Sequence, residues 1–166
     1  SMKLSDGGII CDSCLKYASD AFIHYHLDSL TVNDFKEYIS QKRAERARLL
    51  SQFEKTKTFR ITGQDILYVD EEKGLWYDAS DRNPDMFRLD QVRDCYMADE
   101  IPRTHKDIHY PSIEDDPIYE VIVFKLNHPF IKCVQLVLTN TKSPTYSEDH
   151  KLCNDIVTYF SRANGN

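Results

Sequence analysis

Cys11 and Cys14 form a Cys-x-x-Cys pair, the spacing in this sequence that points most directly to chemistry. The pair supplies two thiolates, whereas structural zinc is almost always held by four ligands in a tetrahedron. His24 and His26 follow in the same segment, and in an extended chain both side chains would lie on one face. The two missing ligands therefore come from these histidines, from a Cys-x-x-Cys pair upstream of the sequence, or from a second chain.

We expect this chain to lack a stoichiometric tetrahedral zinc made only from its own residues, because a thiolate pair binds zinc weakly without two more ligands. A bound zinc would be shared between two chains, each contributing Cys11 and Cys14, or would recruit His24 and His26. A redox function of the pair is disfavoured, since no βαβ pattern surrounds it. The sequence thus predicts half of a zinc site, which a homodimer formed through the N-terminal segment would complete.

Two other clusters resemble metal sites without meeting their requirements. His105 and His109 have helical i, i+4 spacing, but prolines at positions 102 and 111 bracket them, so we expect a solvated loop. Asp81, Asn83 and Asp85 resemble the start of a calcium loop, yet methionine and valine stand where such a loop needs glycine and glutamate. We interpret the Asn-Pro-Asp sequence at 83–85 as a turn.

The sequence contains no recognisable catalytic motif. It lacks a glycine-rich phosphate loop, a nucleophile elbow and a His-Glu-x-x-His pair. Cys95 and Cys133 lie in apolar strand contexts, where a thiol is usually inert packing. A small metal-dependent hydrolase that uses the Cys-x-x-Cys metal is a remaining alternative, disfavoured because no carboxylate or histidine cluster accompanies the pair. We expect a protein that is not an enzyme.

Composition indicates about one ordinary globular domain. The chain has 166 residues, 41% hydrophobic and 29% charged, with a formal net charge of −6 and a pI near 5.5. The acidic balance argues against broad nucleic-acid binding, and the apolar runs are too short to span a membrane. Five cysteines without an export signal are typical of reduced thiols in a cytoplasmic protein.

Residues 31–55 contain no glycine or proline and predict a long helix. Thr31 can cap the backbone N–H of Asp34, and one helical stripe carries Phe35, Tyr38, Ile39, Leu49, Leu50 and Phe53. Basic residues interrupt the stripe in its middle. Either the two ends of the helix pack on two different parts of the structure, or the helix packs on one surface that the apolar stems of its lysine and arginine side chains cover in the middle. We expect the C-terminal apolar residues to pack on a sheet, and the N-terminal ones on the N-terminal segment or on another chain.

Residues 56–166 predict strands followed by one amphipathic helix. The predicted strands are 66–69, 75–77, 86–89, 94–97, 118–126 and 131–138, of which the last two have the strongest patterns. The helix runs from about Ser147, as its cap, to Ser161. About seven antiparallel strands must bury one face, and the final helix is the natural plug. The predicted class is α+β, with a strongly bent antiparallel sheet or partial barrel in the pleckstrin-homology-like (PH-like) order.

Several motifs resemble a family of uncharacterised bacterial and phage proteins that carry an N-terminal two-knuckle Cys-x-x-Cys zinc-ribbon-like element, a linking helix and a PH-like domain. The resemblance rests on segments 3–15, 31–32, 68–71, 83–92 and 127–129, with Phe53 and Thr56 before the first strand. It implies a knuckle remnant at 3–30, a linking helix at 31–55, a PH-like domain at 56–166, a non-enzymatic binding role and no catalytic residues. The first knuckle is missing, so it either precedes this sequence or this member begins at Met2.

Together these patterns favour a cytoplasmic binding or adaptor module with a protein partner. One candidate partner surface is the basic stretch from Lys42 to Arg60, and the other is a sheet edge or loop mouth. The basic residues at the centre of the helix are the principal candidates: Lys42, Arg43, Arg46 and Arg48. The alternative is recognition of anionic lipid at a membrane surface by the same stretch.

Overall fold

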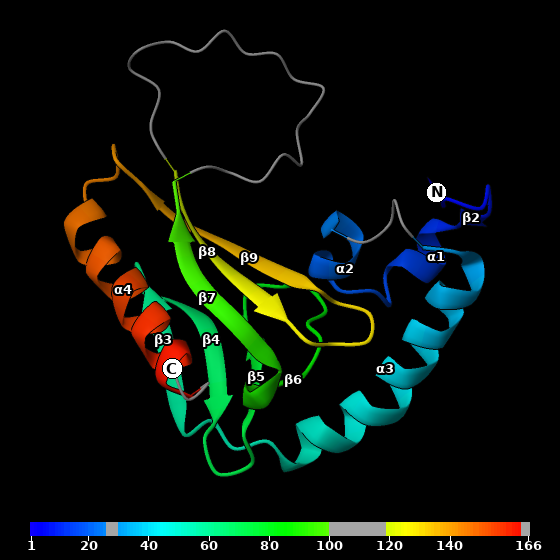
Figure 1. Cartoon of the computed structure of the whole chain (residues 1–166), viewed down its shortest axis with the longest axis horizontal. Coiled ribbons are helices and arrows are strands. Elements are labelled where there is room, and N and C mark those ends of the chain that lie inside the picture. Colours follow the sequence, from blue (N-terminus) through cyan, green and yellow to red (C-terminus); the bar gives the residue numbers. More distant parts are fainter. Residues whose placement is uncertain (26–29, 100–118, 164–166) are drawn as a thin grey trace, which may run out of the picture.

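The computed structural model describes residues 1–25, 30–99 and 119–163. Its N-terminal part is a short hairpin followed by three helices, the last of them long. These elements are β1 (Met2–Lys3), β2 (Ile9–Ile10), α1 (Asp12–Leu15), α2 (Asp20–Tyr25) and α3 (Val32–Gln52). In Figure 1 they lie together on one side of the molecule, with α3 running down beside the strands.

The rest of the described chain forms two antiparallel sheets and a C-terminal helix. The first sheet has the order β3 (Lys57–Ile61), β4 (Gln64–Asp70), β5 (Leu75–Asp78) and β6 (Phe87–Arg88). A short 3-10 helix, η2 (Leu89–Gln91), leads into the second sheet, ordered β7 (Val92–Ala98), β8 (Tyr119–Leu126) and β9 (Cys133–Asn140). The helix α4 (Tyr146–Ala163) lies on the side opposite α3 (Figure 1).

The α+β class predicted from the sequence is confirmed, and the expected hairpins form. Gly74 closes the β4–β5 turn with a φ of 65°, which favours glycine because it has no Cβ. Apart from the β1–β2 hairpin, the described strands form two open sheets and no closed barrel, since η2 separates β6 from β7 and no pairing joins them. The cap proposed for the last helix is wrong: α4 begins at Tyr146, so Ser147 lies inside its first turn. Thr145 precedes that turn, and its carbonyl accepts from the Asp149 N–H at 3.0 Å.

An aromatic cluster fills the space between α4 and the sheets. Phe160 of α4 lies edge-on to Trp76 of β5 and Phe124 of β8, with ring centroids 5.0 Å and 4.9 Å away. Phe59 and Phe87 extend the cluster along β3 and β6, and all five side chains are buried. The helix α4 therefore covers the apolar faces of the two sheets, as the strand pattern predicts.

The helix α3 begins as its sequence predicts. The Thr31 hydroxyl accepts from the Asp34 N–H at 3.2 Å, and the Asp34 carboxylate accepts from the Thr31 N–H at 3.0 Å, which is a complete capping box. Phe35 and Tyr38 pack on the N-terminal segment, where the Tyr38 ring stacks on Phe22 with centroids 3.9 Å apart. The expected contact of this half of the helix is confirmed.

The C-terminal half of α3 docks less fully than its apolar stripe predicts. Phe53 lies edge-on to Tyr77 of β5, with ring centroids 5.1 Å apart. Leu50, which we expected to pack on the sheet, is 36% exposed, and this expectation is wrong. The helix meets the sheet at its end, and its basic middle contacts the turn at 81–85, so the side that carries Leu50 faces solvent.

Asp78, at the end of β5, is a buried carboxylate with a perturbed acidity. It accepts from the Ser80 N–H at 2.8 Å and from the Ser80 hydroxyl. Burial raises the pKa of Asp78 to about 6, because the Ser80 hydrogen bonds offset only part of the desolvation of the charged form. The folded chain therefore holds this proton more tightly than the unfolded chain, so Asp78 contributes stability at low pH that is lost as pH rises through about 6.

The substitution Asp78→Asn is expected to stabilise the protein above pH 7 by about 1–3 kcal/mol, because the amide removes the buried charge and keeps an acceptor for Ser80. Urea unfolding of variant and wild type at several pH values between 4 and 8 measures the effect. The difference in unfolding free energy should grow with pH. Glu72→Gln, in the exposed β4–β5 turn, is the control and should give a small, flat difference. A flat difference for Asp78→Asn would contradict the assignment.

Candidate functional site

The Cys-x-x-Cys pair lies at the surface, where β2 meets α1. Cys11 is the residue before α1 and Cys14 lies in its single turn, and both side chains are exposed. The Cys11 sulfur lies 2.9 Å from the Ser13 hydroxyl. Hydrogen bonds from Ser13 and from the Cys14 thiol lower the pKa of Cys11 to about 7, and the same thiol contact raises the pKa of Cys14. Each thiol therefore changes the pKa of the other.

Asp6 and Gly8 fix this segment against the start of α3. The Asp6 carboxylate accepts from the Gly8 N–H at 2.9 Å and from the Val32 N–H at 3.1 Å, so it also satisfies an unpaired donor of the helix. A Cβ on Gly8 would lie 2.1 Å from a Val32 methyl, so no other residue fits without a shift. The position of the cysteines relative to α3 is therefore held by packing and by hydrogen bonds.

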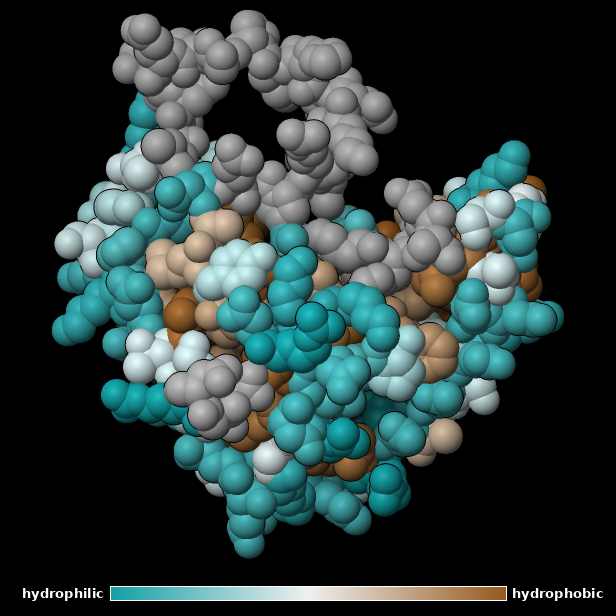
Figure 2. Space-filling view, in the orientation of Figure 1, coloured by the Kyte–Doolittle hydropathy of each residue, from teal (hydrophilic) through white to brown (hydrophobic). Residues whose placement is uncertain are grey.

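An apolar groove of about 730 Å³ separates the cysteines from α3. Its volume is in the range of small-molecule and peptide side-chain sites. Figure 2 shows hydrophobic surface among hydrophilic residues at this N-terminal end of the molecule, and Ile9 there is 71% exposed. The residues that line the groove come from two segments: Ile9, Ile10, Cys11, Cys14 and Tyr17 from one, and Val32, Phe35, Lys36, Ile39, Ser40, Arg43 and Ala44 from the other.

Of the residues predicted to bind a metal, Cys11 and Cys14 lie close together at the surface. In the part of the chain that the structure describes, no three His, Cys, Asp or Glu side chains gather to hold a metal ion, so Cys11, Cys14 and His24 do not form such a group. His24 lies in the last turn of α2, and His26 lies outside the described residues, as do His105 and His109. Two thiolates suit zinc in type, and two more ligands are needed to close its tetrahedron.

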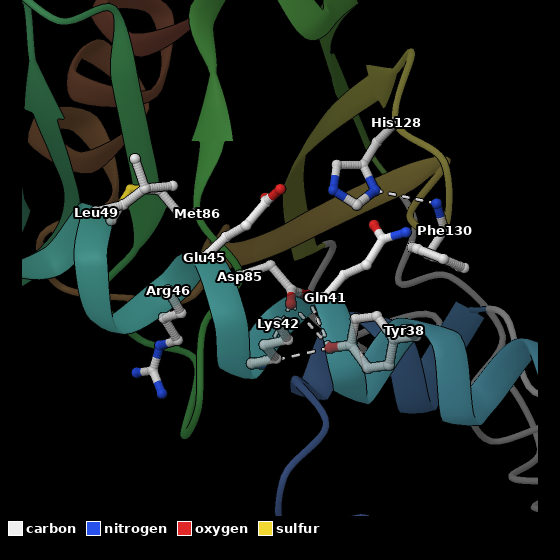
Figure 3. Close-up of a pocket in the computed structure, with 10 residues that line it drawn as sticks. All are labelled: Tyr38, Gln41, Lys42, Glu45, Arg46, Leu49, Asp85, Met86, His128 and Phe130. Carbon is white, nitrogen blue, oxygen red and sulfur yellow. Dashed lines mark hydrogen bonds and ion pairs between the residues drawn. The ribbon is translucent and has the colours of Figure 1, made fainter.

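A buried polar network joins α3 to the turn at 81–85. Lys42 and Asp85 are both 6% exposed, and the Lys42 ammonium lies 3.2 Å from the Asp85 carboxylate. The same carboxylate accepts from the Tyr38 hydroxyl at 2.8 Å (Figure 3). It also accepts from the Ser19 hydroxyl. Burial lowers the pKa of Lys42, and Asp85 opposes that shift. Burial and the Asp85 charge raise the pKa of Tyr38, which keeps its proton as a donor.

The turn at 81–85 also binds the N-terminal segment. The Asp81 carboxylate accepts from the N–H groups of Asp20 and Ala21 at the start of α2, at 3.0 Å and 3.2 Å. The Asn83 amide donates to the carbonyls of Lys16 and Tyr17 at 3.2 Å and 2.9 Å. These side chains, which resemble a calcium loop in the sequence, are a connector between the N-terminal segment and the strands. The interpretation of these residues as a turn was correct, but no local pattern indicates which residues the turn contacts.

This network corrects the predicted basic partner surface. Lys42 is buried, and Arg46 donates to the side chain of Asn83. The Arg43 guanidinium lies 4.1 Å from the centre of the Tyr17 ring, and Arg48 is exposed. The four basic residues therefore do not form one cationic patch, because some of them make contacts within the protein and others face solvent. The cavity beside them measures about 40 Å³, which is room for a few water molecules only (Figure 3).

A second groove, of about 440 Å³, lies between β3 and α4. Four consecutive β3 residues line it, so it follows the edge of the strand, since successive side chains of a strand point to opposite faces. The strand β3 pairs with β4 on its other side and has no second partner strand in the described part. The lining residues are Lys57, Thr58, Phe59 and Arg60 from β3 and Leu152, Asp155, Thr158, Tyr159 and Arg162 from α4.

Glu120 of β8 is a buried carboxylate that sequence reasoning missed. Its Oε1 accepts from the Tyr146 hydroxyl at 2.6 Å and lies 2.6 Å from Nδ1 of His150, while its Oε2 has no hydrogen-bond partner. Thirty positions separate Glu120 from His150, so no local spacing could have paired them. Cys153 lies nearby on α4, and burial raises its pKa to about 12, so its thiol stays protonated and acts as a core side chain. The buried Cys95 has the same role.

Comparisons of the chain with protein-family models, with curated proteins and with solved structures find no match. Within the described residues, no helix combines the length and the apolar character needed to cross a membrane. The two grooves are therefore the features from which a function can be inferred.

Proposed function

We propose that this chain is a non-enzymatic protein-binding module whose residues 56–166 form a PH-like domain. The proposal is supported by the order of the elements: a four-stranded antiparallel sheet, a three-stranded antiparallel sheet and a C-terminal helix packed on both. That order agrees with the motifs that resemble the PH-like family. Because one fold serves many functions, the binding mode must come from a particular surface.

The observation that carries the binding mode is the groove along the unpaired edge of β3. An extended segment of a partner can add to a free strand edge, where its backbone forms hydrogen bonds and its alternate side chains enter pockets. The α4 side of the groove offers Leu152 and Tyr159 for apolar side chains. We infer that the partner contributes one extended strand between β3 and α4.

The charges around this groove favour an acidic partner segment. Lys57, Arg60 and Arg162 line it against the single carboxylate of Asp155. Arg60 is partly neutralised by its ion pair with Asp65, which leaves Lys57 and Arg162 as the main cations. Lys57 lies 5.3 Å from the centre of the Tyr159 ring, so it is held close to the groove. Electrostatic complementarity then supplies specificity and association rate.

Recognition of anionic membranes by the basic stretch is the weaker proposal. Lys42 and Arg46 are engaged with Asp85 and Asn83, so the stretch presents fewer cations to a lipid surface than its sequence indicates. Each basic residue near a membrane contributes only about 1 kcal/mol. Sedimentation with vesicles that contain anionic lipid tests this alternative, and salt-sensitive binding would support it over the strand groove.

Selection of a displayed peptide library on the full chain tests the strand groove. We expect the selected peptides to be acidic. Lys57→Glu and Arg162→Glu should each weaken the best peptide about tenfold in a fluorescence anisotropy titration, because each reverses a charge beside the groove. Arg48→Glu, on the exposed surface of α3, is the matched control and should leave the affinity unchanged. Peptides whose affinity is insensitive to both groove variants would contradict the proposal.

A further inference from the structure

The apolar groove beside the cysteines has a feature that the strand groove lacks: an incomplete metal site on its wall. Cys11 and Cys14 both line this groove, and both are exposed. Zinc closes its tetrahedron with four ligands, and the described part of the chain brings no third ligand to the pair. This surface therefore lacks two of the four zinc ligands, and it also leaves an apolar groove exposed to solvent.

We propose that two copies of this chain bind one zinc ion between them, with Cys11 and Cys14 of each copy as its four ligands, and that the two N-terminal grooves pack against each other around it. The described residues of one copy supply two of the four ligands, and the second copy supplies the other two. A two-fold axis through the metal relates the copies, so the same patch on each chain makes the contact.

Self-complementarity of the patch supports this occupant. Ile9 is 71% exposed at the rim of the groove, and Phe35 and Ile39 line the opposite wall. In a two-fold contact, Ile9 of each copy enters the groove of the other copy. The same contact therefore forms twice. Burying an isoleucine side chain is favourable, and the contact does this once for each copy.

The charge around the cysteines also fits a shared thiolate site. Four thiolates around one divalent cation leave a net negative charge, which needs nearby cations when apolar surface surrounds it. Lys36 and Arg43 of α3 line the groove with the cysteines. Arg43 stacks on Tyr17, which holds its guanidinium near the Cys14 side of the groove. Each copy would thus supply thiolates and compensating cations together, and the ligand protons would be released on binding.

Cobalt titration and mass measurement test the proposal independently of the strand groove. Reduced, metal-free full chain is titrated with Co²⁺, which reports tetrahedral thiolate coordination by its visible and charge-transfer absorption. We expect saturation at one metal per two chains, and native mass spectrometry should then show a zinc-bound dimer. Cys11→Ser and Cys14→Ser should each abolish the absorption and the dimer. Ile9→Asp should shift the metal-loaded protein toward monomer at equal zinc, because it places charge in the apolar contact.

Two matched variants make the outcome decisive. Cys133→Ser alters a thiol on β9, away from the groove, and should change neither the stoichiometry nor the mass. Replacement of His24 and His26 by alanine should also leave both unchanged. Saturation at one metal per monomer, loss of the metal in the histidine variant, absence of metal binding by the wild type, or a dimer that persists in Cys11→Ser would each overturn the shared site.

Discussion

Lys42→Met is expected to lower the free energy of unfolding by about 3–5 kcal/mol, because it leaves the buried Asp85 carboxylate without its charged partner. Methionine keeps most of the apolar stem of the lysine, so the loss would report the ion pair rather than a cavity. The Lys42 ammonium also contacts the Tyr38 hydroxyl at 3.3 Å and the Asn83 carbonyl, and both contacts are lost with it. Urea unfolding followed by circular dichroism measures the change.

Arg48→Met is the matched control for this experiment. Arg48 lies on α3 like Lys42 but is exposed, so its replacement should change the unfolding free energy by less than about 0.5 kcal/mol. Equal stability of the two methionine variants would show that the ion pair contributes nothing net, as buried pairs sometimes do.

Phe160→Ala is expected to destabilise the protein by about 3–5 kcal/mol, the usual cost of truncating a fully buried phenylalanine. Phe160 is fully buried and meets Trp76 and Phe124 edge-on, so its removal leaves a cavity that these large rings cannot readily close. Thermal unfolding measures the loss, with the Trp76 fluorescence as a local report, since Trp76 is the only tryptophan.

Thr158→Ala provides the control on the same helix. Thr158 is exposed, and alanine has the higher helix propensity, so this variant should be neutral or slightly stabilising. A small effect of Phe160→Ala, comparable with that of Thr158→Ala, would mean that α4 is not the plug of the two sheets. Removal of the chain from Ser147 onward should expose the same apolar faces and give an insoluble product.

The local elements of this protein were readable from the sequence because local spacing specifies them. Thr31 and Asp34 stand three positions apart and form the capping box of α3, and the apolar period of residues 152–160 predicts the buried face of α4. Gly74 ends a charged turn between two apolar runs and closes the β4–β5 hairpin. The Cys-x-x-Cys pair was visible for the same reason, since its ligand spacing is a local property.

The tertiary structure alone decided which of these residues meet. Lys42 and Arg48 are both basic residues of one helix, and only the position of the turn at 81–85 makes the first a buried partner of Asp85 and leaves the second in solvent. The Ser19–Asp85 contact joins positions 66 residues apart, and no periodicity in either segment specifies it. The groove beside Cys11 likewise depends on how the N-terminal hairpin packs on α3. Composition and spacing determine where helices, strands and turns form, whereas burial and charge pairing depend on which distant surfaces cover one another.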